Sequence, residues 1–197
     1  MLKYTNERRV YVRVISGAAR GVKLSSLKGD NTRPTSDKVK ESIFNIITPY
    51  IYEASFLDLF SGTGNMGIEA VSRGAGRAVL VEKHRMCFNI IEENIEKTKL
   101  RDRIELVKND VYSTLKRLSS EGKKFDIIFM DPPYSKDLVK PCLVEIDKGT
   151  LLAEDGIIVI EHDIKDEIVE QVGNLIKNRE KKYGNTMITF FSKEEKE

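Results

Sequence analysis

The chain has 197 residues, 40% of them hydrophobic, which suits a single α/β domain with a buried core. Its two cysteines, Cys87 and Cys142, lie far apart and are accompanied by only two histidines, so neither a disulfide framework nor a zinc site is indicated. No apolar run approaches the roughly 18 residues of a membrane span, and the first residues lack a signal-peptide pattern, which predicts a cytoplasmic protein.

The positive charge of the chain is concentrated at its N-terminus. The net charge is only +2, yet residues 1–40 carry ten Lys and Arg against three Asp and Glu, a balance of +7 that leaves −5 for the rest. A basic arm on an acidic body is typical of a protein that binds a polyanion, because each bound phosphate releases counterions. The alternative is a solvated terminal segment without a partner.

The first predicted elements are a hairpin and a helix. Residues 10–15 and 22–24 have strand-like composition and flank a glycine-containing turn over residues 17–21. Helix-capping residues follow Pro34, and apolar residues then recur at helical spacing up to Pro49. We therefore expect a basic, RNA-contacting extension over residues 1–50, followed by the main domain over residues 51–197.

From residue 55 onward, apolar runs of strand length alternate with helical segments, the pattern of a parallel sheet covered on both faces. The strands are predicted over 55–60, 77–82, 103–108, 125–131 and 156–161. The helices are predicted over 65–73, 84–99, 111–119 and 136–147. At the end, residues 175–181 and 186–191 flank Gly184 as a hairpin that adds two final strands, one of them antiparallel.

The strongest local motif is a buried strand followed by Gly62, Gly64 and Gly67, a GxGxxG pattern that opens a helix. The glycines permit a tight turn without protruding side chains, so a ligand can approach the backbone amides at the helix start. Glu82, at the end of the next strand, is placed to accept hydrogen bonds from ribose hydroxyl groups. The pattern predicts a nucleoside pocket, as found in nicotinamide enzymes and in S-adenosylmethionine (SAM) enzymes.

Two carboxylates favour SAM over a nicotinamide dinucleotide. Asp58 precedes the glycines at the end of its strand, where it suits the cationic methionine ammonium of SAM and would repel a pyrophosphate. Asp110 closes the third strand, where it is placed to accept a hydrogen bond from the adenine amino group. The alternative function of Asp110 is to cap the helix that begins at Val111.

The sequence Asp131-Pro132-Pro133-Tyr134 follows the fourth strand, at the edge where open α/β sheets bind ligands. Two prolines fix the backbone and remove two amide donors, so Asp131 and the Pro132 carbonyl can hold both hydrogens of an exocyclic base amine. This would orient the nitrogen toward the SAM methyl group, with Tyr134 stacked on the extruded base. A Pro-Pro turn with an incidental tyrosine is the structural alternative.

These residues resemble a known family, the DPPY-type SAM-dependent methyltransferases, and within it the bacterial 16S ribosomal RNA guanine-N2 methyltransferases (RsmD-like). The resemblance covers nearly the whole chain, and the Thr-Arg-Pro-Thr sequence with its following helix is its most specific part. The matching segments are 13–17, 20–21, 23–24, 32–45, 57–64, 131–134 and 183–186. In one departure, Asn65 and Met66 stand where the family often has small apolar residues.

The resemblance implies a Rossmann-like, seven-stranded class I methyltransferase fold with a small N-terminal hairpin and helix. It also implies methylation of the 2-amino group of a guanine in 16S ribosomal RNA as the 30S subunit assembles. By motif match, the residues that bind SAM are Asp58, Gly62, Gly64, Glu82 and Asp110, and those that handle the base are Asp131, Pro132 and Tyr134. Arg20, Lys23 and Arg33 are the candidate RNA contacts, and we expect a monomer without a metal.

Other functions fit parts of the pattern. A DPPY-type enzyme for adenine or for a protein amide usually has a recognition insert or an extra domain, for which this chain has no long segment left. A nicotinamide oxidoreductase would need a hydride-transfer acid that is not evident, and a non-catalytic RNA-binding module would not need intact glycines. His84 and His162 are expected as solvent-facing or loop residues, and Glu161 as a residue that merely ends a strand.

Overall fold

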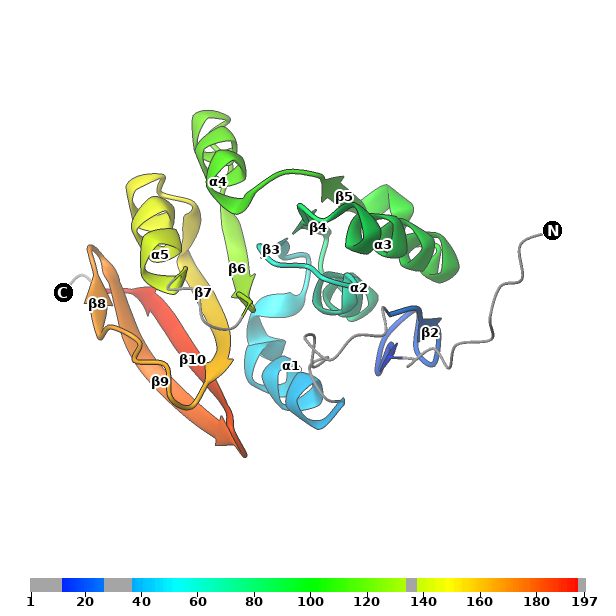
Figure 1. Cartoon of the computed structure of the whole chain (residues 1–197), viewed down its shortest axis with the longest axis horizontal. Coiled ribbons are helices and arrows are strands. Elements are labelled where there is room, and N and C mark those ends of the chain that lie inside the picture. The colour runs from blue at the N-terminus through cyan, green and yellow to red at the C-terminus, as the bar shows by residue number, and fades with distance from the viewer. Residues whose placement is uncertain (1–11, 27–36, 134–137, 195–197) are drawn as a thin grey trace.

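The computed structural model describes residues 12–26, 37–133 and 138–194, and its centre is a mixed sheet of eight strands (Figure 1). Five parallel strands form one part of this sheet: β3 (Ser55–Asp58), β4 (Arg77–Val81), β5 (Ile104–Val107), β6 (Phe125–Met130) and β7 (Leu152–Asp163). The strand order is β5-β4-β3-β6-β7-β10-β9-β8. The chain therefore builds outward in opposite directions from β3 and β6, and ligands bind at such a switch point.

The C-terminal hairpin completes the sheet. β9 (Leu175–Tyr183) and β10 (Thr186–Lys193) join at Gly184, and β10 lies antiparallel between β7 and β9. The fold class is confirmed, since these two strands and the five parallel ones make the seven that were predicted. The two-residue β8 (Gln171–Val172) adds an eighth strand at the edge, which was not expected.

Helices cover both faces of the sheet (Figure 1). On one face lie α1 (Asp37–Ile51), α2 (Asn65–Ser72) and α3 (Arg85–Thr98), and on the other lie α4 (Val111–Ser120) and α5 (Val139–Lys148). A short 3₁₀ turn, Arg101–Arg103, leads into β5. A hydrophobic core lies on each face of the sheet, and neighbouring residues of the central strand β3 point into different cores. Phe56 packs on the side of α1 and α2, and Leu57 packs on the side of α4 and α5. Both are fully buried, as a parallel sheet covered on both faces requires.

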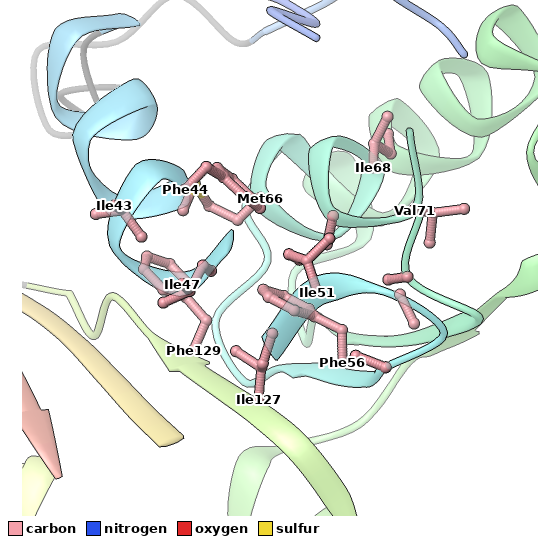
Figure 2. Close-up of a cluster of buried hydrophobic side chains, with 14 of the residues drawn as sticks. Ile43, Phe44, Ile47, Ile51, Phe56, Met66, Ile68, Val71, Ile127 and Phe129 are labelled. Atoms are coloured by element: carbon pink, nitrogen blue, oxygen red, sulfur yellow. The ribbon is translucent and has the colours of Figure 1, made fainter. Parts of the chain in front are cut away.

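The segment before β3 packs into the same core as the sheet. β1 (Val12–Arg13) pairs antiparallel with β2 (Lys23–Leu24), so the predicted hairpin is confirmed within the described residues. Figure 2 shows Phe44 and Ile47 of α1 among side chains of α2, β3 and β6. Gly17 in the hairpin turn has φ +83°, and a Cβ there would lie 1.7 Å from the carbonyl oxygen of Ser72, so only glycine permits this approach to α2.

Several predicted boundaries need correction. α1 does not end at Pro49 but continues to Ile51, because proline removes only one amide donor in the last turn and Ile51 is buried beneath it. The predicted strand 55–60 ends at Asp58, where the chain leaves the sheet to form the glycine loop. β7 extends well beyond 156–161, because it pairs with β6 on one side and β10 on the other. Of the predicted helix 136–147, the first two residues lie outside the described ranges.

Candidate active site

The carboxyl ends of the parallel strands bring the predicted site residues to one edge of the sheet, which we call the catalytic edge. Asp58 ends β3, Glu82 follows β4, Asp110 lies just beyond β5, and Asp131 follows β6. Residues far apart in the sequence meet here because parallel strands all finish at the same edge. The glycine loop, residues 61–64, leaves this edge and enters α2.

The glycine loop has the backbone geometry that its motif predicts. Gly62 and Gly64 have φ angles of +53° and +75°, in the left-handed region that favours glycine. A Cβ on Gly64 would lie 3.0 Å from Ile91 and 3.1 Å from Leu80, so Gly64 packs against the protein. A Cβ on Gly62 would meet nothing within 4 Å. Gly62 therefore presents bare backbone to open space, as a close-approaching ligand requires.

Glu82 anchors the glycine loop. This side chain is buried, and its Oε2 accepts a hydrogen bond from the amide of Gly62 at 3.0 Å, while Oε1 accepts one from the amide of His84 at 2.7 Å. Each carboxylate oxygen has two lone pairs, so both oxygens retain acceptor capacity. The arrangement fits the expected contact with a ribose and adds an anchoring function that sequence reasoning did not identify.

Asp58 is a buried carboxyl group with an unsatisfied oxygen. Its side chain is 1% exposed, and its Oδ1 has no hydrogen-bond partner among the described residues. Burial raises its pKa to about 7, with a smaller contribution from the charge of Glu82, against the lowering effect of hydrogen bonds from Phe60, Ser61 and Gly67. Buried polar atoms are normally paired, so an orphaned carboxylate oxygen here fits a cationic ligand group such as the ammonium of SAM.

Asp110 caps a helix, as its alternative interpretation predicted. Its Oδ1 accepts a hydrogen bond from the amide of Ser113 at 3.0 Å, which marks the start of α4, and this bonding to Ser113 lowers the pKa of Asp110. The side chain is exposed at the same edge as Glu82. A carboxylate that caps through one oxygen can still accept through the other, so the cap is compatible with an adenine contact.

Asp131 lies beside a second carboxylate that sequence reasoning treated only as a strand end. Met130 of β6 pairs with Ile160 of β7, so Asp131 and Glu161 are neighbours at the catalytic edge. Burial raises the pKa of Asp131 well above its usual value, and the charges of Glu161 and Asp58 raise it further. Pro132 follows within the described residues, whereas Tyr134, predicted to stack on the base, lies outside them.

A fully buried lysine supports the start of α2, and sequence reasoning missed it. Lys40 of α1 donates hydrogen bonds to the carbonyl of Arg13 at 2.6 Å and to Oδ1 of Asn65 at 2.7 Å. It also forms an ion pair with Glu69 at 3.1 Å. Burial lowers the pKa of Lys40 and the nearby Glu69 opposes this shift. Asn65, which departs from the family pattern, directly follows the glycine loop, and its bond with Lys40 therefore joins the end of this loop to α1.

Glu69 connects the same network to the N-terminal hairpin. Its fully buried carboxylate accepts hydrogen bonds from the amides of Ile15 at 2.8 Å and Ser16 at 2.9 Å, and pairs with Arg73 at 2.7 Å. The signal for a buried lysine was present in the sequence, because Lys40 shares helical spacing with the buried apolar residues of α1.

Asn94 of α3 forms a hydrogen bond with the backbone of the glycine loop. Its Nδ2 donates to the carbonyl of Thr63 at 2.9 Å and to the carbonyl of Ser25 at 3.0 Å, and its Oδ1 accepts from the amide of Ser25 at 2.7 Å. Asn94 is fully buried. The segment that follows β2 is thus bonded, through one side chain, to the loop that is expected to bind the cofactor.

Of the candidate RNA contacts within the described residues, Arg20 lies away from the catalytic edge. Arg20 is exposed in the hairpin turn, whose residues Ala18 and Ala19 donate to the carbonyl and hydroxyl of Ser72 at 2.8 and 3.0 Å. Ser72 is the last residue of the eight-residue α2, about 12 Å along the helix from the glycine loop. Lys23 is exposed in β2, and Arg33 lies outside the described residues.

The prediction that both histidines face solvent or lie in loops was wrong for one of them. His162 was expected in solvent or in a loop, but it lies buried in β7, where Nε2 contacts the Thr189 hydroxyl at 2.8 Å and burial lowers the histidine pKa. His84 is exposed at the start of α3, as expected. Within the described ranges there is no cluster of metal-ligating side chains, and no helix has the length and apolar character needed to span a bilayer.

A cavity of about 420 Å³ is found elsewhere on the molecule. It lies at the opposite edge of the sheet, where β7 and β9 begin and β10 ends, and its lining includes Leu152, Leu175 and Lys193. None of its lining residues belongs to the site described above.

Known proteins resemble this chain over most of its length. The family model described as Conserved hypothetical protein 95 matches residues 12–192. A protein of Bacillus subtilis (strain 168), "Putative rRNA methyltransferase YlbH", is 40% identical over 182 residues, which span 92% of this chain and 99% of that protein. "Ribosomal RNA small subunit methyltransferase D" of Escherichia coli (strain K12) is 30% identical over 183 residues, or 93% of this chain and 90% of that protein. The solved structure of "Putative methyltransferase yhhF from Escherichia coli" superposes with a TM-score of 0.82 at 30% identity, covering 94% of this chain and 99% of that one.

Proposed function

The chain belongs to the Conserved hypothetical protein 95 family of RsmD-like methyltransferases, and on this premise we propose that it transfers a methyl group from SAM to the 2-amino group of a guanine in 16S ribosomal RNA. The names of its relatives support methylation of ribosomal RNA. The choice of guanine and of N2 rests on the resemblance of the segments around Pro34 and of the Asp131-Pro132-Pro133-Tyr134 motif. We place the reaction on the assembling 30S subunit in the cytoplasm.

The residues at the catalytic edge fit SAM. The observation that carries the proposal is the orphaned, buried Oδ1 of Asp58, because an unpaired carboxylate oxygen beside an open glycine loop matches the ammonium of the methionine moiety. Bare backbone at Gly62 allows the ligand to approach, Gly64 keeps the loop packed on the protein, and Glu82 and Asp110 would accept from ribose and adenine. When bound, SAM supplies an electrophilic methyl group on its sulfonium sulfur.

Asp131 and Pro132 provide the groups that would position the target amine. The lone pair of an exocyclic amine is delocalised into the base, so the nitrogen must be oriented before it can attack. Asp131 and the Pro132 carbonyl accept its two hydrogens and direct the lone pair at the methyl carbon. Bound SAM would supply the methyl group and leave as S-adenosylhomocysteine, so that the methylated nitrogen has one proton to lose. Asp131, already hydrogen-bonded to the amine in this arrangement, is the nearby group placed to receive that proton.

The basic N-terminal extension supports an RNA substrate, with Arg20, Lys23 and Arg33 as proposed phosphate contacts. Because Arg20 lies at the far end of α2, its contact would be with RNA away from the reacting base. Tyr134 is proposed to stack on the base after the base leaves its helix.

Methyl transfer to ribosomal RNA tests this function. The protein is incubated with radiolabelled SAM and either 30S subunits or free 16S RNA from a strain that lacks it, and the RNA is digested to nucleosides. The proposal predicts label in N2-methylguanosine. Label in N6-methyladenosine or in another nucleoside would refute the guanine target, and absence of transfer to either RNA would refute the ribosomal substrate.

A further inference from the structure

One face of strand β9 carries positive charge to the catalytic edge; we define this β9 face as Arg179, Lys181 and Tyr183. β10 is antiparallel to both β7 and β9, so β7 and β9 run in the same direction and end at the same edge. Figure 1 shows the β9–β10 turn on the same side of the molecule as the start of α1.

Strand register places Lys181 in line with the site carboxylates. Ile188 of β10 pairs with Glu161 on one side and with Lys181 on the other. These residues form one row across three strands, and Glu161 is in turn the neighbour of Asp131. With strands about 4.8 Å apart, the Lys181 backbone lies about 10 Å from that of Glu161, and Cβ atoms in one row point to the same face.

The two faces of β9 differ in charge. Arg179 pairs with Phe190, which lies in the core on the α1 side, and the guanidinium carbon of Arg179 is 5.9 Å from that ring. The ammonium of Lys181 is 5.7 Å from the ring of Tyr183. Both cations are exposed, and within the described part of the chain neither forms an ion pair. The β9 face is therefore positive and is not neutralised by a described acid.

Glu180, the acidic residue of β9, forms its contacts on the opposite face of the strand. Glu180 pairs with Thr189, accepts a hydrogen bond from its hydroxyl at 3.2 Å, and forms an ion pair with Lys177 at 3.1 Å. Lys177 also pairs with Glu170. Among the described residues, β8 pairs only with the first two residues of β9, so the rest of β9 has an open edge, where charged residues can prevent edge-to-edge pairing of sheets. That protection alone does not require two cations on the face that carries Glu161.

The β9 face is held in a fixed position. Tyr183 is half-buried against the α1-side core, and its hydroxyl hydrogen-bonds with that of Ser42 on α1. Arg179 lies over a fully buried phenylalanine. Cations that rest on aromatic rings lose less conformational entropy when they bind an anion than free surface lysines do.

We propose that the β9 face binds the phosphate backbone of the RNA beside the target base. This inference rests on the proposed RNA substrate, and it assigns the RNA contact nearest the reaction to β9, with the N-terminal hairpin contacting more distant RNA. A cationic surface in line with Asp131 and Glu161 offsets the repulsion between those carboxylates and an approaching polyanion.

Glutamine substitutions on the two faces test this assignment. The double variant Arg179→Gln/Lys181→Gln removes both charges and keeps polar side chains with the first two methylenes of each stem, whereas Lys182→Gln removes an adjacent charge from the opposite face as the control. Binding of 16S RNA is measured at several salt concentrations, together with kcat, the KM for RNA and the Kd for SAM. Thermal melting checks that each variant is folded.

The double variant is expected to bind RNA roughly tenfold more weakly, with the log–log salt slope reduced by up to about 1.5, because two phosphate contacts are lost. Its kcat at saturating RNA and its Kd for SAM stay at the wild-type values, and Lys182→Gln behaves like wild type. An unchanged salt slope in the double variant, or an equal loss in Lys182→Gln, would overturn the β9 assignment alone. Failure of the wild-type protein to bind or methylate RNA would instead refute the proposed function.

Discussion

Asp58 shows how one residue can be unfavourable for the fold and useful for the site. Its carboxyl group is buried without a partner for Oδ1, and its pKa is raised to about 7. The folded, ligand-free protein therefore holds a proton that the unfolded chain releases near pH 3.8. Stability from this group is present at low pH and is lost as the pH rises from about 4 to about 7, the opposite of a salt-bridged carboxylate. An ion pair with a ligand ammonium would offset part of the free energy that burial of the carboxylate costs.

The affinity for SAM should accordingly depend on pH. In the proposed site the ammonium pairs with the ionised carboxylate, so we expect binding to tighten by up to about tenfold per pH unit between pH 5.5 and 7, and to level off where Asp58 is already ionised. Calorimetric titrations in buffers of different ionisation enthalpy would measure the accompanying release of up to one proton. Asp58→Asn should remove this pH dependence. A wild-type affinity that is flat from pH 5.5 to 7 would contradict the assignment of Asp58.

At the scale of elements, the glycine loop depends on contacts from three other segments. Glu82 after β4 bonds the amide of Gly62, Asn94 of α3 bonds the carbonyl of Thr63, and Lys40 of α1 bonds Asn65. The N-terminal hairpin joins this arrangement through the buried Glu69. The hairpin and α1 thus support the glycine loop, in addition to any contact they make with RNA.

Lys40→Met tests the energetic importance of this network. Methionine fills a similar volume but leaves Glu69 with Arg73 as its one charged partner among the described residues, so we expect a loss of about 3–5 kcal/mol in the free energy of unfolding, as for other broken buried ion pairs. The control is Arg101→Met, which breaks the exposed pair with Glu96 and should cost less than about 1 kcal/mol. Urea denaturation measures both, and equal losses in the two variants would contradict the structural importance of Lys40.

At the scale of the whole molecule, the sequence predicts most of the fold because local patterns encode it. Apolar runs alternating with amphipathic segments give the parallel sheet, and an acid at the end of a run, as at Asp58 and Asp131, is placed at the catalytic edge by topology alone. The two-residue β8 is too short to have a pattern. Burial of His162 depends on pairing with β10, which periodicity does not specify.

The supporting residues of the site could not be predicted in the same way. Lys40 meets Glu69, Asn94 meets Ser25, and Glu161 meets Asp131 through contacts between segments distant in the chain. Helical spacing indicates that Lys40 lies on a buried stripe but does not identify its partner. The position of Arg20, at the far end of α2, likewise follows from the docking of the hairpin on Ser72, which no motif encodes.

The central claim is that different residues of the catalytic edge bind the cofactor and position the base. The variant Asp131→Ala tests this claim most directly. SAM affinity and methyl transfer to the ribosomal substrate are measured on the same preparation. The account predicts a SAM Kd within about twofold of wild type and a turnover lowered by about two to four orders of magnitude, the scale of losing a positioning or charge-stabilising group. Parallel loss of SAM binding and turnover, or a turnover close to wild type, would contradict it.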